Sequence, residues 1–120
     1  MNQAPAADKM SEAAYRQCTD TMLAMIEATV DRWLQQGVID IDPQRTGGLL
    51  ELEFPGGHRI VVNTQPPLQE LWLASPAAAN HFRCVASRWV DTKDGRDFID
   101  VLSAEASALA GKPLDFAAGR

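Results

Sequence analysis

The chain has 120 residues, of which 46% are hydrophobic and 22% are charged, so it is long enough to form one globular domain with its own core. Its formal net charge of −5 argues against a nucleic-acid ligand, because binding phosphates requires clustered Lys and Arg. No apolar run approaches the roughly 20 residues of a membrane span, and residues 1–10 lack the basic start and apolar core of a signal peptide. Cys18 and Cys84 form no Cys-x-x-Cys motif, so we expect reduced thiols in a soluble cytoplasmic protein.

The first predicted element is a long amphipathic helix. Residues 1–10 are rich in alanine and polar groups and predict a loose, disordered tail, which leaves residues 11–120 as a single domain. Ser11 can cap a helix that ends at Gly37. The apolar residues between them recur at helical spacing and form one stripe: Tyr15, Cys18, Met22, Met25, Ile26, Thr29, Val30 and Trp33.

Short alternating segments follow this helix and predict strands. Residues 38–42 predict the first strand, and residues 43–48 predict a turn. The Pro-Gly-Gly at 55–57 indicates a hairpin between two further strands. The remaining predicted strands cover residues 50–54 and 59–63, the segment around Trp72, and residues 81–85 and 88–90, with a turn at 76–79. Consecutive strands of this kind predict an antiparallel meander.

A second amphipathic helix is predicted from Phe98 to Leu109, with capping oxygens from residues 91–94 and a stop at Gly111. Leu114 and Phe116 are expected to pack back against the helices. The order of helix, antiparallel strands and helix predicts an α+β, two-layer sandwich. Because each helix has one apolar stripe, both should cover one face of the antiparallel β-sheet and leave the other face open to solvent.

Five carboxylates are predicted to share one edge of the molecule, which we call the acidic edge: Asp20, Glu27, Asp31, Asp40 and Asp42. At about 100° per residue, the first three fall within roughly 20° of one line on the helix, nearly opposite the apolar stripe. The last two are two residues apart in the predicted strand 38–42 and therefore share a face. Carboxylates without nearby His or Cys suit hard cations such as Fe²⁺, Fe³⁺, Mn²⁺ or Ca²⁺, bound weakly because the groups keep much of their water. An acidic helix face is, however, usually only a solvated face.

The strand around Trp72 carries a large aromatic side chain on its polar side. Leu71 and Leu73 fall on one face, whereas Glu70 and Trp72 fall on the other. With Asn63 and Gln65 just before it, this side forms a mixed polar and aromatic surface, which we call the sheet-face patch (Asn63, Gln65, Glu70 and Trp72). Tryptophan is enriched at binding hot spots, so the patch indicates a docking surface; the alternative is that Trp72 caps the sheet against a loop. We expect Arg59, Val61 and either His81 or Arg83 nearby.

The same region carries a family resemblance. The pattern, which is similar to that of the bacterial frataxin family, consists of Asn63-x-Gln65-Pro66, Trp72-Leu73-Ala74-Ser75, His81-Phe82, Trp89-x-Asp91 and Gly95-x-x-Phe98. The resemblance covers roughly residues 11–116. It implies a two-helix, one-sheet sandwich, an acidic ridge that binds iron and meets the basic surface of a cysteine desulfurase, and a tryptophan at the position of Trp72 that contacts the iron–sulfur scaffold protein.

The acidic edge departs from the family pattern because several acids are missing. Ala28 and Arg32 stand beside Glu27 and Asp31, and the other substituted positions are Leu34, Gln35, Gln36 and Gln44. Arg32 next to Asp31 also weakens a cation site by repulsion. The loss of these acidic residues affects iron affinity more than it affects partner binding, because partner binding needs only a net negative electrostatic field.

No catalytic or phosphate-binding motif occurs in the sequence, so we expect a binding protein and not an enzyme. The resemblance implies a monomeric iron donor or iron-dependent regulator of iron–sulfur cluster assembly. A metal-independent electrostatic adaptor of the same complex is the alternative, and a ferroxidase is a third class that requires a buried, converging carboxylate and histidine site.

Overall fold

The computed structural model describes residues 9–119. Most of the predicted tail therefore lies outside the described residues, but its last two positions, Lys9 and Met10, do not. The Met10 backbone N–H donates to Gln69 Oε1 (2.9 Å), and the Met10 carbonyl accepts from Gln69 Nε2 (2.7 Å). Both backbone groups of Met10 are thus bonded to one side chain, and the loose tail stays a prediction for the residues before it.

The first helix, α1 (Glu12–Gln35), forms as predicted. The Ser11 hydroxyl accepts from the backbone N–H of Ala14 (3.0 Å) and satisfies one of the free donors of the first turn. The inner side of the helix is buried, with Leu23 and Ile26 fully inaccessible to solvent. Gly37 follows the helix with a φ of +72°, a conformation that favours glycine and ends the segment.

Six antiparallel strands follow and pair in chain order from β1 to β6, as in a meander. Their bounds are β1 (Asp42–Thr46), β2 (Leu49–Glu53), β3 (Arg59–Gln65), β4 (Glu70–Ala74), β5 (Ala79–Val85) and β6 (Arg88–Asp91). A short 3-10 turn, η1 (Pro66–Leu68), separates β3 from β4.

The predicted position of the first strand is wrong. Residues 38–41 form the connection from α1, in which the Val38 backbone N–H bonds to the Trp33 carbonyl (2.8 Å) and the Val38 carbonyl accepts from Lys112 Nζ (2.6 Å). The first strand occupies most of the predicted turn 43–48, because the turn is only the glycine pair 47–48. Pro43 is tolerated in β1 since this strand lies at the edge of the sheet and pairs on one side only.

The second helix, α2 (Phe98–Ala110), also forms as predicted, and it ends at Gly111 with a φ of +70°. The predicted capping residues are wrong: the cap is Asp97, whose side chain accepts from the backbone N–H of Ile99 (2.8 Å). Asp91 instead accepts from the backbone N–H groups of Lys93 and Asp94, which holds the loop before the helix. The chain then enters η2 (Phe116–Gly119).

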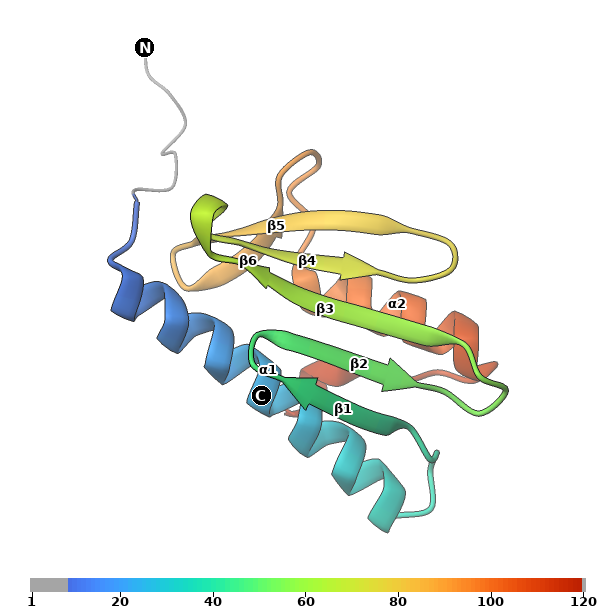
Figure 1. Cartoon of the computed structure of the whole chain (residues 1–120). Coiled ribbons are helices and arrows are strands. Elements are labelled where there is room, and N and C mark those ends of the chain that lie inside the picture. Colours follow the sequence, from blue (N-terminus) through green and yellow to red (C-terminus); the bar gives the residue numbers. More distant parts are fainter. Residues whose placement is uncertain (1–8, 120) are drawn as a thin grey trace.

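Both helices cover the same face of the sheet, as Figure 1 shows. The strand register places Leu50, Val62 and Leu73 side by side on the inner face, each no more than 1% exposed. The side chains from α1, α2 and this face form one hydrophobic cluster, in which Phe116 packs against Trp33 with ring centroids 4.8 Å apart. This arrangement confirms the predicted two-layer α+β sandwich. None of the helices in residues 9–119 is both long and apolar enough to cross a membrane.

Candidate functional site

The acidic residues of α1 lie on the outer side of the helix, as predicted. Asp20 and Asp31 are exposed and Glu27 is half-buried, whereas Leu23, Ile26 and Val30 are buried on the inner side. Helix burial therefore turns these three carboxylates toward solvent along the edge of the molecule next to β1.

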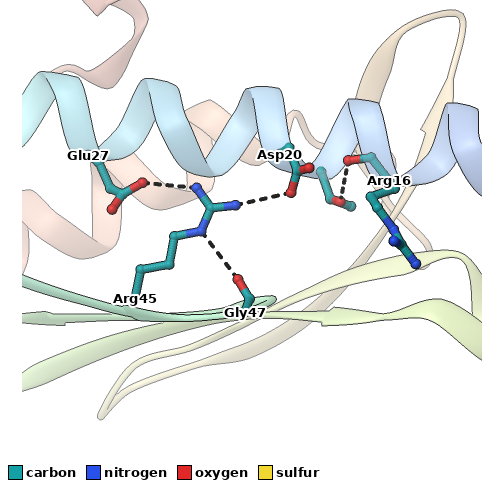
Figure 2. Close-up of polar contacts among 6 residues, drawn as sticks. Arg16, Asp20, Glu27, Arg45 and Gly47 are labelled. Atoms are coloured by element: carbon teal, nitrogen blue, oxygen red, sulfur yellow. Dashed lines mark hydrogen bonds and ion pairs between the residues drawn. The ribbon is translucent and has the colours of Figure 1, made fainter.

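Arg45 of β1 reaches across to two of these carboxylates. Its guanidinium is 3.0 Å from Asp20 Oδ1 through one terminal nitrogen and 3.0 Å from Glu27 Oε1 through the other, as Figure 2 shows. Its Nε also donates to the Gly47 carbonyl (3.2 Å). The Arg45 side chain is 26% exposed, so this ion pair is partly shielded from water. Arg45 thus offsets one of the two negative charges that Asp20 and Glu27 bring to the acidic edge.

The other three carboxylates of the acidic edge do not pair with Arg45, and two of them accept hydrogen bonds from neutral amides. Asp31 accepts from the Gln35 amide (2.9 Å), and Asp42 accepts from the Gln44 amide (3.4 Å). Asp40 is exposed in the connection between α1 and β1. These three carboxylates keep their charge on the surface. Across residues 9–119, no three carboxylate, histidine or cysteine side chains converge closely enough to hold a metal ion.

Arg45 is the residue of this site that the sequence did not reveal. The segment 43–48 was predicted as a turn, which leaves the direction of its side chains undefined. In the structure Arg45 pairs in register with the inward-facing Leu50, so its side chain lies on the helix side of the edge strand and meets α1. The signal in the sequence is a basic residue two positions before a Gly-Gly turn, in alternation with the polar Gln44 and Thr46.

The sheet-face patch lies on the open face of β3 and β4, as predicted. The register places Asn63, Trp72 and His81 side by side, and Gln65, Glu70 and Arg83 in the next row. Both His81 and Arg83 therefore belong to this face, where only one of them was predicted. Figure 1 shows that these strands form the centre of the sheet and that neither helix lies over their outer face.

Trp72 is held in one orientation by two neighbours. Its ring is stacked on the His81 imidazole, with centroids 4.0 Å apart and an angle of 7° between the planes. Its Nε1–H donates to Glu70 Oε1 (2.8 Å), and the same carboxylate oxygen is 3.9 Å from His81 Nδ1. Because the indole donor is already used, a partner would meet the half-buried Trp72 through the apolar surface of its ring.

The fold and these two surfaces define a small acidic α+β protein in which no group of three His, Cys, Asp or Glu side chains within residues 9–119 could hold a metal ion. Residues 8–112 match the family model described as the frataxin-like domain, so the chain belongs to the frataxin-like family. This match confirms the resemblance that the motifs around Trp72 indicate.

Known relatives are similar over nearly their whole length. The chain is 44% identical over 109 residues to the iron-sulfur cluster assembly protein CyaY of Variovorax paradoxus, which covers 91% of this chain and 99% of the relative. It is 40% identical to the protein of the same name from Polaromonas sp., over 89% of this chain and 92% of the relative.

Solved structures have the same architecture. Frataxin from Psychromonas ingrahamii superposes with a TM-score of 0.79 at 28% identity, over 89% of this chain and 98% of that one. Trimeric frataxin from the yeast Saccharomyces cerevisiae, in complex with ferrous iron, gives a TM-score of 0.66 at 26% identity, over 91% of this chain and 94% of that one.

Proposed function

We propose that this chain acts in iron–sulfur cluster assembly as a non-enzymatic binding protein that docks on the assembly machinery. The observation that carries this proposal is the near full-length similarity to relatives that are named iron-sulfur cluster assembly proteins. The exposed carboxylates of the acidic edge and the aromatic sheet-face patch provide two surfaces suited to docking.

We assign the electrostatic contact to the three carboxylates of the acidic edge that do not pair with Arg45. Asp31, Asp40 and Asp42 keep exposed charges, whereas Asp20 and Glu27 are paired with Arg45. A basic surface on a cysteine desulfurase would be attracted to the first group by long-range forces and would gain less from the second. Trp72, oriented by Glu70 and His81, would contact the scaffold protein with Asn63 and Gln65.

We propose iron binding at the same three carboxylates, Asp31, Asp40 and Asp42. Carboxylate oxygens suit Fe²⁺ and Fe³⁺, and a yeast relative was solved in complex with ferrous iron. Because these carboxylates do not converge, we expect weak binding in which water supplies most of the ligands. The guanidinium of Arg45 would repel a cation from Asp20 and Glu27, so these two residues should contribute least.

A ferrous titration followed by amide NMR tests the metal proposal. We expect broadening at residues 31–42, with smaller changes around Asp20 and Glu27. If these amides do not respond and the desulfurase still binds, the protein is a metal-independent adaptor. Saturable ferrous oxidation with turnover, lost when Asp31 and Asp42 are replaced, would instead require a ferroxidase.

Charge reversal tests the docking proposal. Asp31→Lys with Asp42→Lys should leave the fold intact and abolish desulfurase binding. The matched control is Asp94→Lys with Asp115→Lys, which changes the net charge equally at exposed positions before and after α2. Equal loss in both double variants would show that only total charge matters, and no loss in either would remove the electrostatic model. Light scattering of the free protein would test the predicted monomer, since the yeast relative is trimeric.

A further inference from the structure

Two thiols from distant parts of the chain meet between α1 and β5. Cys18 lies one turn after the buried Tyr15, and Cys84 lies two residues after the buried Phe82, on the helix-facing side of β5. The ring of Tyr15 packs edge-on against Trp89 with centroids 6.2 Å apart, and Trp89 is the register partner of Cys84. Cys18 and Trp89 line the same groove, and Trp89 lies directly opposite Cys84, so the two cysteines are neighbours. In agreement with this placement, Cys18 is one of the groups that raise the pKa of the Cys84 thiol.

Both sulfur atoms are free thiols, and both residues are only half-buried. A groove of about 510 Å³ borders Cys18, with Met22 and Trp89 in its wall. A second cavity, of about 310 Å³, borders Cys84 beside Met10 and Gln69. Two small residues that only filled the core would be closed off from solvent, whereas here each cysteine is half-buried and lines a cavity of its own.

We propose that Cys18 and Cys84 form a dithiol site that a low-molecular-weight disulfide oxidises to an intramolecular disulfide, which joins α1 to β5. The thiolate of one cysteine attacks the reagent's S–S bond and releases one small thiol. The thiolate of the other cysteine then attacks the resulting mixed disulfide and releases the second small thiol. The protein loses two protons and two electrons, and the reagent, which is reduced to two thiols, gains them.

The surroundings of Cys84 set the pH dependence of this reaction. Burial, followed by the neighbouring Cys18, raises the pKa of the Cys84 thiol, and this outweighs a hydrogen bond from the Ser87 backbone that lowers it. Since the thiolate is the reactive form, the cross-link should form slowly at neutral pH and faster in alkaline solution. The site does not depend on the acidic edge or on the sheet-face patch, so it can be tested separately from the proposed function.

The experiment is oxidation of the folded full chain with oxidised glutathione, followed by tryptic mapping without reduction. Cleavage after Arg16, Arg32, Arg83 and Arg88 isolates the two cysteines in peptides 17–32 and 84–88. We expect these two peptides to be linked in a monomer whose mass falls by two hydrogen atoms. The rate should rise between about pH 7 and about pH 9, and dithiothreitol should reverse the reaction.

Two variants and one further measurement complete the test. Cys18→Ser and Cys84→Ser should each abolish the link and retain one reactive thiol. Oxidation should raise the Tm of the wild-type chain and leave the Tm of both variants unchanged or lower. Stable glutathione adducts on both cysteines, a cross-link between two chains, or a disulfide that forms only in urea would each overturn the proposal.

Discussion

Replacing Arg45 by glutamine tests the most specific feature of the acidic edge. The guanidinium makes ion pairs of 3.0 Å to both Asp20 and Glu27, and its Nε donates to the Gly47 carbonyl. Glutamine is too short to reach both carboxylates and carries no charge. The variant should therefore be less stable, and at the same time it should present a more negative surface.

The expected loss of stability follows from the exposure of the three side chains. Arg45 is 26% exposed, Glu27 34% and Asp20 58%, so the pairs are partly shielded but not buried. Ion pairs of this kind contribute about 0.2–1 kcal/mol each, and the hydrogen bond to Gly47 adds about 0.5 kcal/mol or more. The free energy of unfolding should fall by about 1–2 kcal/mol, and the effect should shrink in high salt.

Arg59→Gln is the matched control. Arg59 also contacts two carboxylates, those of Glu51 and Glu53, but at 3.4 and 3.8 Å and with 57% of its side chain exposed. Urea unfolding should show a change of about 0.5 kcal/mol or less for this variant. If Arg45→Gln costs no more than Arg59→Gln, the pairing of Arg45 with the acidic edge does not stabilise the fold.

Binding measurements on Arg45→Gln give the second half of this prediction. With Asp20 and Glu27 unpaired, affinity for a basic partner should rise by up to about fivefold, with a steeper salt dependence. Unchanged or weaker binding would contradict the assignment of Arg45 as a residue that masks part of the acidic edge.

Three further predictions concern other parts of the fold. Trp72→Ala should weaken scaffold binding by about 2 kcal/mol or more without unfolding the protein, and calorimetry showing an unchanged affinity would remove the sheet-face patch from the docking model. Burial opposes ionisation of Asp91, but hydrogen bonds from the Lys93 backbone, the Asn80 amide and the Asp94 backbone, with Arg96 nearby, outweigh it and lower the pKa of Asp91. A lowered pKa in the folded state stabilises the fold above the unfolded-state pKa of about 3.9, and this contribution is lost as the pH falls through the folded-state value. Thermal unfolding should therefore show that Asp91→Asn destabilises the fold near pH 7 and that this difference shrinks as the pH falls below about 3.9. A pH-independent difference would contradict this. Gly48→Ala should lower the free energy of unfolding by about 1–3 kcal/mol, because the added methyl group would overlap the Thr64 hydroxyl. In urea unfolding, adding Thr64→Ala should restore part of this stability. Full stability of Gly48→Ala alone would show that the Thr64 side chain moves aside at little cost.

Strong periodicity made most of the fold predictable. The stripe from Tyr15 to Trp33 and the alternation around Leu71 and Leu73 each have one buried side, which fixes both the element and its orientation. β1 was not predictable in this way, because it is a polar edge strand with a proline and has no buried hydrophobic residue. Its pairing depends on the register with β2, which is a tertiary property.

The sequence predicted which way the main side chains of the candidate site point, but not the contacts between them. The outward direction of Asp20 and Asp31 follows from the burial of the opposite helix side, and that of Trp72 follows from its alternation with Leu71 and Leu73. The ion pairs of Arg45 could not be predicted, because they join residues far apart in the sequence. They also depend on β1, whose position was predicted wrongly. The stacking of His81 on Trp72 likewise required the register of β4 with β5.

The distribution of the indole rings gives the molecule a built-in optical reporter. Trp33 and Trp89 are 8% and 4% exposed, whereas Trp72 is half-buried on the open face of the sheet. A water-soluble quencher such as iodide should therefore act mainly on the emission of Trp72. A partner that covers Trp72 should protect its emission from iodide, so docking could be measured in the unlabelled protein. The emission of the two buried rings would serve as the internal reference.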